Sequence, residues 1–292
     1  MPTVWQHLAT PPALPGLFLR AALRRGIRSQ PLPNLGLRCE LSVDPRHLAR
    51  YRQVCGIAAS AYLPAAYPHI LAFPLQMQLL TDARFPLPLL GLVHVENRVR
   101  VLRPLGGLGP FTVSVELGAL QPHSKGGVFS LITRLEDQLG LLWEGESRML
   151  CRGLQVPGVA VNPPTATPLP LSDVAQWAAP AGIGRRYARA SGDFNPIHLS
   201  AISARLFGFP RAIAHGFWNK ARTLAELQQH LPDAGYELSV RFQQPLLLPG
   251  AVTLQASAPG PSGQLGLQGQ DGTVHMSGRW QPVDSCGAAH KA

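Results

Sequence analysis

The sequence predicts an α+β protein built from two similar halves, each with one long helix wrapped by an antiparallel sheet. Two observations favour this class. The order of predicted helices and strands starts again after residues 152–171, a proline-rich stretch typical of a linker. Short motifs of the first half (1–151) also recur in the second half (172–292). One helix leaves apolar surface of its sheet uncovered, so the halves should pair into a continuous sheet around both helices.

The first half begins with residues 1–36, a basic extension that holds one predicted helix at 17–25. A strand is predicted at 37–43 from its alternating pattern. Asp44 followed by Pro45 is typical of a helix start, and Gly56 of a helix end, which predicts a helix between them.

An apolar helix is predicted next at 69–82, where Pro74 should kink the helix or shift its start. Strand-like runs separated by Gly and Pro turns then predict an antiparallel meander. Its strands are expected at 92–102, 111–117, 127–135 and 141–151.

The second half repeats this order, with a strand at 175–179, a short helix at 184–191 and a long helix at 215–229. Four strands are predicted after the long helix, at 237–242, 251–258, 264–270 and 274–281. The tail after Val283 is small and polar, so we expect it to fray.

The chain is strongly basic, with a net charge of +10 from 26 lysines and arginines against 16 acidic residues. Such a charge can serve nucleic acid, a membrane surface or a phosphorylated ligand. No run of Lys and Arg with interleaved aromatic residues occurs, which argues against nucleic acid. An anionic substrate carrier is the better match.

The cysteines and the N-terminus bear on the compartment. Four cysteines without C-x-x-C spacing predict neither a zinc site nor a disulfide framework, which favours a reducing, cytoplasmic compartment. No stretch reaches about 18 apolar residues, so no membrane span is expected. Several arginines and no acidic residue precede Glu40, which indicates either a targeting presequence or a basic extension packed on the domain.

An acid–base pair lies at Asp193 and His198, on either side of the dipeptide Asn195-Pro196. Proline fixes its own φ and moves the preceding residue away from the α region, which predicts a tight turn rather than a helix. Gly192 can close the helix before this turn. A turn of this kind can bring a carboxylate and an imidazole over one pocket, where they suit acid–base chemistry near neutral pH.

The start of the helix at 215–229 offers further candidates. The Gly216 N–H would be a free donor at a positive helix end, able to stabilise an oxyanion. His215 either lines the pocket or packs at the helix N-terminus, and Phe217 and Trp218 are either core residues or substrate contacts. The histidines show no metal-ligand spacing, so no metal is expected.

Residues 187–204 resemble the signature of the MaoC-like dehydratases, the R-specific enoyl-CoA hydratase family. The matching residues are Tyr187, Ser191, Gly192, Asp193, Asn195, Pro196, Ile197, His198 and Ala204. Ala190 departs from the family pattern, at a packing position. The resemblance implies a double hotdog, two hotdog units in one chain, with Asp193 and His198 as the catalytic dyad and Asn195 supporting the substrate pocket.

The two halves share an aromatic, a small residue and a glycine in fixed order. The matches are Tyr51, Cys55 and Gly56 with Tyr187, Ser191 and Gly192, His69 with His215, and 100–104 with 241–245. However, Ile57 follows Gly56 where Asp193 follows Gly192. The first half is also shorter here, with 13 positions from Gly56 to His69 against 23 from Gly192 to His215.

The first half is therefore predicted to be non-catalytic and to leave an open apolar channel, lined by stretches such as 71–80. Such a channel would favour medium or long acyl chains over short ones. The substrates implied by the resemblance are trans-2-enoyl thioesters of CoA or acyl carrier protein, hydrated reversibly to R-3-hydroxyacyl thioesters in fatty-acid metabolism. Asp193 and His198 would hold the water, and Gly216 would stabilise the thioester oxygen.

The implied enzyme is a hydro-lyase without a cofactor, a monomer or homodimer of double hotdogs that spans no membrane. Two alternatives stay open. One is a thioesterase on the same fold, because a fold does not fix a function. The other is a non-catalytic partner subunit that lends only a tunnel wall.

Overall fold

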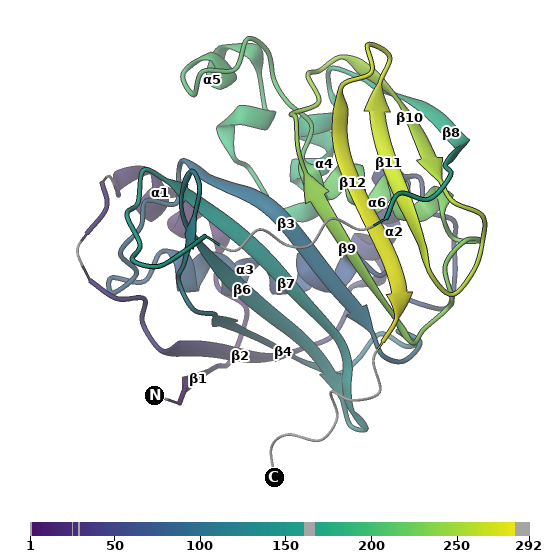
Figure 1. Cartoon of the computed structure of the whole chain (residues 1–292). Helices are drawn as coiled ribbons and strands as arrows, with labels where there is room; N and C mark the ends of the chain where they lie inside the picture. The colour runs from purple at the N-terminus through teal and green to yellow at the C-terminus, as the bar shows by residue number, and fades with distance from the viewer. Residues whose placement is uncertain (1, 25, 29, 161–166, 284–292) are drawn as a thin grey trace.

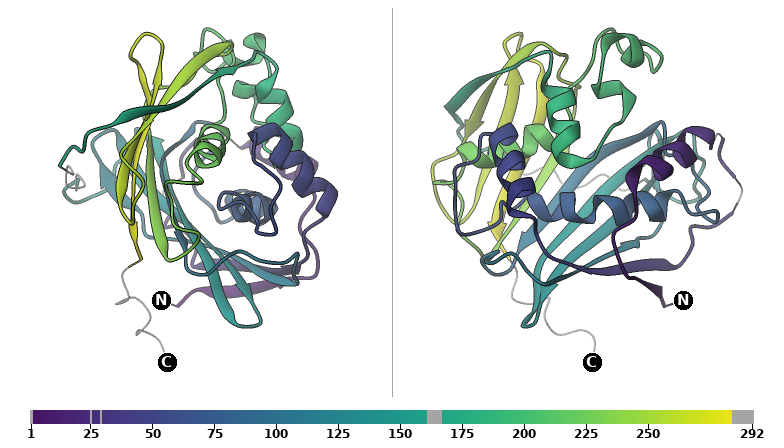
Figure 2. Two further views of the ribbon diagram at one scale, coloured as in Figure 1. Left: turned by 90° about the vertical axis from the view of Figure 1, so that its right-hand side faces the viewer. Right: turned by 180° about the vertical axis from the view of Figure 1, so that it is seen from behind.

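A 12-stranded sheet curls around two long helices (Figure 1, Figure 2). The computed structural model describes residues 2–24, 26–28, 30–160 and 167–283. The strands of the first half are β1 (Val4–Leu8), β2 (Leu35–Leu41), β3 (Leu92–Val101), β4 (Phe111–Leu117), β5 (Gln121–His123), β6 (Gly126–Asp137) and β7 (Gly140–Arg152). Those of the second half are β8 (Ser172–Ala179), β9 (Tyr236–Phe242), β10 (Gly250–Ala256), β11 (Gly263–Gly269) and β12 (Val274–Pro282).

The strands follow the order β1-β2-β4-β6-β7-β3-β9-β12-β11-β10-β8, with β5 beside β6. The predicted meander is confirmed for β4, β6 and β7, but β3 pairs antiparallel with β7 rather than with β4, the next strand along the chain. Strand β3 thus lies at the centre of the sheet, where its other edge pairs antiparallel with β9. The offset that matches Arg100 with Arg241 also matches Arg98 with Ser239, and those two residues pair directly. An approximate twofold axis therefore passes between β3 and β9.

The two long helices, α3 (Tyr67–Leu80) and α6 (Gly216–Glu226), lie inside the curved sheet (Figure 2). Pro74 lies within α3 without ending the helix, and α3 begins two residues before the predicted start, where Pro68 occupies its first turn. Leu75 and Leu79 of α3 and Ala221 of α6 are fully buried. Burial of these apolar faces against the sheet is the main source of stability for both helices.

Two further helices, α2 (Pro45–Cys55) and α4 (Ile183–Ser191), end at the predicted glycines. The Asp44 carboxylate accepts a hydrogen bond from the Arg46 N–H at 2.9 Å, which caps the start of α2. Gly56 and Gly192 take left-handed φ values of 64° and 78°, which side chains other than glycine rarely adopt. The sequence signals that place these helices are therefore local, and they act as expected.

The helices α2 and α4 pack against each other in opposite directions. The Tyr51 and Tyr187 rings lie 6.2 Å apart, as the matched motif predicts. However, the ring centroids of Tyr67 and Tyr51 lie 5.1 Å apart in the first half. In the second half, the ring centroids of His215 and Tyr187 lie 4.9 Å apart. Tyr67, rather than His69, thus occupies the place of His215, and the match of His69 with His215 was wrong because the two preceding segments differ in length.

The N-terminal extension packs on the domain. Strand β1 pairs parallel with β2, and α1 (Leu14–Leu23) buries Leu17 and Ala21. Arg24 donates to the carbonyl of Asp82 at 2.7 Å and to that of Phe85 at 3.0 Å, just after α3. The predicted helix at 17–25 is present with an earlier start, and its last residue lies outside the described ranges. Strand β1 is mostly exposed, which is why its sequence gave no strand pattern.

Residues 193–214 form an overhang that projects from the second half at the top of Figure 1. It contains the 3₁₀ helix η1 (Pro196–His198) and the helix α5 (Ala201–Arg205). Neither was predicted, because both are too short to show a hydrophobic period. The turn at Pro196 is thus a single helical turn, contrary to the expectation of no helix there.

The overall architecture confirms the predicted α+β fold. No helix in the described part of the chain is long and apolar enough to cross a membrane. Cys39, Cys55 and Cys151 are free and buried. The boundaries of the halves stay a prediction, since 161–166 in the linker lie outside the described ranges, as does the tail after Val283.

Candidate active site

Three side chains from two segments meet beside the start of α6. Their ligand atoms, from Asp193, His198 and His215, all lie within 4.8 Å of one another. Asp193 and His198 come from the Asn-Pro turn, and His215 from the residue that precedes α6. The turn therefore brings Asp193 and His198 together, as predicted, and His215 adds a second imidazole from the start of α6.

Local hydrogen bonds orient the Asp193 carboxylate. The Asp193 Oδ1 accepts a hydrogen bond from the Asn195 N–H at 3.1 Å, and the backbone N–H of Asp193 donates to Ser191 Oγ at 3.2 Å. About a third of the side chain, 32%, remains exposed, so the carboxylate stands at the opening of the site. Burial of its surroundings raises the pKa of Asp193 above the ordinary value, while the nearby His198 opposes that rise.

A hydrogen bond to the backbone orients the His198 ring. Its Nδ1 lies 2.8 Å from the carbonyl oxygen of Ile213, and because a carbonyl can only accept, Nδ1 carries the proton. Nε2 is left with a free lone pair. Burial lowers the pKa of His198 below its usual value, although Asp193 partly offsets this. The result at neutral pH is a neutral imidazole beside the Asp193 carboxyl group, and the free Nε2 of this imidazole can accept a proton from water.

Gly184 of α4 supports the turn from below. A Cβ at this position would collide with the carbonyl oxygen of His198. Only glycine lets α4 lie directly against η1, and this contact helps to position His198. No sequence pattern indicates this role, since Gly184 lies outside the matched motif.

His215 acts on the other two residues rather than facing outward. Its Nε2 donates to the carbonyl oxygen of Asp193 at 3.0 Å, and its ring stacks on that of His198 with centroids 3.6 Å apart. The ring is 2% exposed, and burial followed by the charge of His198 lowers its pKa well below the usual value. His215 is therefore a neutral side chain that positions both Asp193 and His198.

The other predicted site residues lie close by with different contacts. The Asn195 side chain accepts from the Ile197 N–H at 3.4 Å and so caps η1. Gly216 is the first residue of α6, where its N–H has no intrahelical partner. The Phe217 ring stacks on His69 at 3.6 Å, between the two long helices. Contacts of Asn195, Gly216 and Phe217 with substrate stay predictions.

The opening of the site is apolar and includes the N-terminal helix. Phe194 is 44% exposed, and its ring lies 6.4 Å from that of Phe18 in α1. A Cβ on Gly192 would lie 2.5 Å from Leu14 and 3.5 Å from Phe73 of α3. Helix α1 therefore forms one wall of the opening, which no short-range pattern in the sequence could indicate.

A cavity of about 140 Å³ lies on the side of the first half. It is bounded by the segment 57–66, by α6 and by the ends of β3 and β9. Its apolar lining includes Leu63, Leu105, Leu224 and Tyr236. The lining comes from α6 rather than from 71–80, so the open channel along α3 stays a prediction.

The trio Asp193, His198 and His215 also has the composition of a metal site. Its geometry fits poorly, because the two imidazoles are stacked with planes only 26° apart. Ring lone pairs lie in the ring planes, so stacked rings direct them side by side rather than toward one central ion. The arrangement favours proton transfer.

A polar cluster is buried between the halves, behind Phe217. Lys220 of α6 is 0% exposed and donates to the Asn97 side chain of β3. Asn97 in turn donates to Ser147 Oγ at 3.1 Å. Burial lowers the pKa of Lys220 to about 7 and that of the neighbouring His94 to about 3.

Comparison with known proteins places this site in a family. Residues 166–275 match the model of the MaoC like domain. A Mycobacterium tuberculosis protein named 3-hydroxyacyl-thioester dehydratase X is 36% identical over 230 residues, which cover 78% of this chain and 81% of the relative. The peroxisomal enoyl-CoA hydratase 2 of Arabidopsis thaliana is 27% identical over 43% of this chain and 45% of its own length.

Solved structures agree. The crystal structure of HtdX of Mycobacterium tuberculosis superimposes with a TM-score of 0.74 at 31% identity, covering 85% of this chain and 100% of that one. A MaoC-like dehydratase from Phytophthora capsici gives 0.71 at 19% identity over 87% of this chain and 96% of its own, a likeness of fold. With this fold, the Asn-Pro turn and a relative similar over most of both lengths, the chain belongs to the MaoC-like dehydratase family.

Proposed function

We propose that this chain is an acyl-thioester hydro-lyase, which interconverts trans-2-enoyl and R-3-hydroxyacyl thioesters in fatty-acid metabolism. The observation that carries the proposal is the pairing of His198, whose Nε2 is free, with the partly exposed Asp193 carboxyl group beside the apolar side chains of Phe194 and Phe18. The names of the relatives from Mycobacterium tuberculosis and Arabidopsis thaliana support the same reaction class.

In the direction of hydration, Asp193 and His198 hold one water between them. As the water oxygen bonds to Cβ, the pair accepts one proton from it. The pair then returns one proton to Cα, so it ends in its starting protonation state. Negative charge that develops on the thioester oxygen is stabilised by the Gly216 N–H at the positive end of α6. Dehydration is the same path in reverse.

One chain has one such site in this proposal. Ile57 stands where Asp193 has its counterpart, and the segment 57–66 has no Asn-Pro turn or histidine. Titration with a tight-binding product analogue should give one site per chain. A stoichiometry of two would contradict a non-catalytic first half.

The direct test uses purified protein with trans-2-decenoyl-CoA. Loss of the absorbance of the conjugated thioester and formation of the R-3-hydroxy product are expected. An S product would contradict the stereochemistry proposed here. Release of free CoA would instead indicate a thioesterase, and no reaction would indicate a non-catalytic subunit.

A further inference from the structure

Five exposed arginines share the outer side of the packed helices α2 and α4. They are Arg46, Arg50, Arg185, Arg186 and Arg189, here called the arginine face. Neither helix contains an acidic residue. Over the described ranges, none of the five forms an ion pair with an aspartate or glutamate. Apart from the Asp44 carboxylate that caps α2, the described chain therefore leaves the positive charge of this face without an ionic partner.

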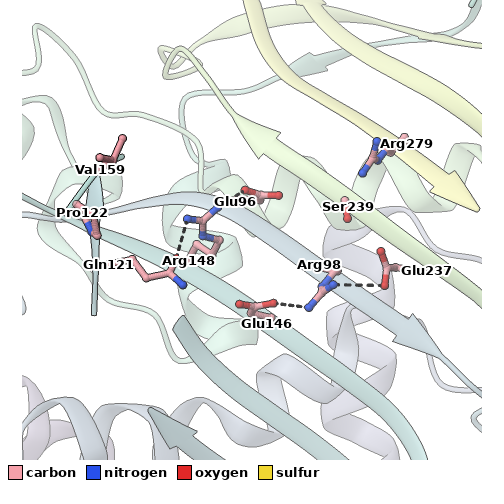
Figure 3. Close-up of a pocket in the computed structure, with 10 residues that line it drawn as sticks. All are labelled: Glu96, Arg98, Gln121, Pro122, Glu146, Arg148, Val159, Glu237, Ser239 and Arg279. Atoms are coloured by element: carbon pink, nitrogen blue, oxygen red, sulfur yellow. Dashed lines mark hydrogen bonds and ion pairs between the residues drawn. The ribbon is translucent and has the colours of Figure 1, made fainter. Parts of the chain in front are cut away.

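The outer face of the sheet is different, as Figure 3 shows. A cavity of about 520 Å³ lies there, lined by three glutamates and three arginines, two of which form ion pairs with these glutamates. Arg98 contacts Glu146 at 2.7 Å and Glu237 at 3.7 Å. Arg148 contacts Glu96 at 3.2 Å in the same way. Although this cavity is the larger, its charges cancel, so it offers an anion less attraction than the arginine face.

The helix ends make the arginine face costly for the isolated chain. Arg46 lies in the first turn of α2 and Arg185 in the first turn of α4. The N-terminal end of a helix carries partial positive charge and repels cations. The Asp44 carboxylate offsets this at α2, whereas α4 has no side-chain cap. The charge of Arg50, after burial, also lowers the pKa of His47 beneath it. An anionic partner on this face would relieve these repulsions.

The arginine face adjoins the opening of the active site. Helix α4 ends at Ser191, so Arg189 lies in its last turn, four positions before Asp193 in the sequence. His47 of α2 lies against the backbone of Ala190, so the end of α2 that carries Arg46 is at the same place. Arg185 also donates to the carbonyl of Leu199 at 2.8 Å, which joins the face to the overhang.

We propose that the arginine face docks an acidic acyl carrier protein, which presents its thioester arm to Asp193 and His198. This inference rests on the proposed function. The arginines form pairs one turn apart, Arg46 with Arg50 and Arg185 with Arg189, about 6 Å along each helix. Neighbouring helix axes lie about 8–10 Å apart. This spread suits carboxylates along a partner helix better than the phosphates of one nucleotide, which concave sites usually bind.

The test compares one acyl group, trans-2-decenoyl, attached to CoA or to a purified acyl carrier protein. The variant Arg186→Glu/Arg189→Glu reverses two charges and leaves the Arg185 contact in place. A second variant on the other helix is Arg46→Glu/Arg50→Glu. The matched control is Arg241→Glu/Arg279→Glu, two exposed arginines of the outer sheet face.

Both docking variants should raise KM for the carrier-protein substrate at least about tenfold while changing kcat/KM for the CoA substrate less than about twofold. The control should change neither. Raising NaCl from about 50 to about 300 mM should weaken the wild-type reaction with the carrier protein more than that of the variants.

Three results would overturn the docking proposal while leaving the proposed function intact. They are a wild type that hydrates only the CoA substrate, a selective loss with CoA, and an equal loss with both substrates. A wild type inactive on either thioester would remove the proposed function itself, and the docking proposal with it.

Discussion

The imidazole rings of His198 and His215 lie stacked, with centroids 3.6 Å apart and planes 26° from parallel. Each ring donates one N–H to a backbone carbonyl, His198 to Ile213 and His215 to Asp193. The two histidines and the Asp193 backbone therefore form one connected unit, which links the overhang to the start of α6.

The first prediction concerns the acid–base pair. Asp193→Asn and His198→Ala should each lower kcat by about 10²–10⁴-fold, because each removes one acceptor for the water proton. The double variant should be little worse than the poorer single variant, since the two act on one water. Steady-state kinetics with an enoyl thioester checks this. Activity near that of the wild type in either single variant would contradict the assignment.

The second prediction separates His215 from the pair. His215→Phe keeps a ring in the stack but removes the hydrogen bond to the Asp193 carbonyl. We expect kcat to fall about 10- to 100-fold with little change in KM, because a small displacement of the carboxylate is costly. The acid limb of the pH profile should also shift. The control is His7→Phe on exposed β1, and an unchanged kcat in His215→Phe would refute the positioning role.

The third prediction follows from the pKa directions. The pKa of His198 lies below 6.5 and that of Asp193 above 3.8. Both groups accept protons in hydration, so activity falls as acid protonates them. The acid limb of kcat/KM should thus have its midpoint above 3.8, and in Asp193→Asn, where His198 alone titrates, the midpoint should lie below 6.5. A midpoint above 6.5 in Asp193→Asn would show that His198 is charged in the resting enzyme.

The fourth prediction uses the buried lysine. The pKa of Lys220 falls from 10.5 to about 7 on folding, so between these values the unfolded chain binds more protons. The free energy of unfolding should therefore rise with pH across this window, by on the order of 1 kcal/mol per pH unit. Lys220→Met should abolish this rise, and the exposed Lys125→Met should keep it. Urea unfolding near pH 7 and 9 measures both.

The fifth prediction concerns metal. The stacked rings of His198 and His215 direct their lone pairs poorly for one ion. Incubation with EDTA or phenanthroline, followed by gel filtration, should leave kcat unchanged. A loss of activity that added Zn²⁺ restores would contradict the acid–base interpretation of this cluster.

Local signals explain what could be predicted from the sequence. Helix α2 begins after Asp44 at Pro45 and ends before Gly56, as predicted, because capping depends on neighbouring residues only. The approach of Asp193 to His198 follows in the same way from the Asn-Pro turn between them. In such cases the residues that determine the structure lie within one or two turns of each other.

Contacts between distant segments explain what was missed. The bond from His215 to the Asp193 carbonyl joins positions far apart in the chain, and the wall formed by Phe18 joins the extension to the overhang. Strand β1 exists only because β2 offers it an edge. The match of His69 with His215 failed for a related reason, since insertions between matched motifs shift the alignment of a repeat.

The twofold axis between β3 and β9 has a consequence for how this enzyme can change. Two hotdog units around such an axis could in principle hold two equivalent sites, but the first half is shorter by a whole segment and differs in more than two side chains. Replacing Ile57 by Asp would supply an acid without the turn, the second imidazole or the wall that orients it. A second site would need an inserted overhang, so point substitutions alone would not restore the symmetry.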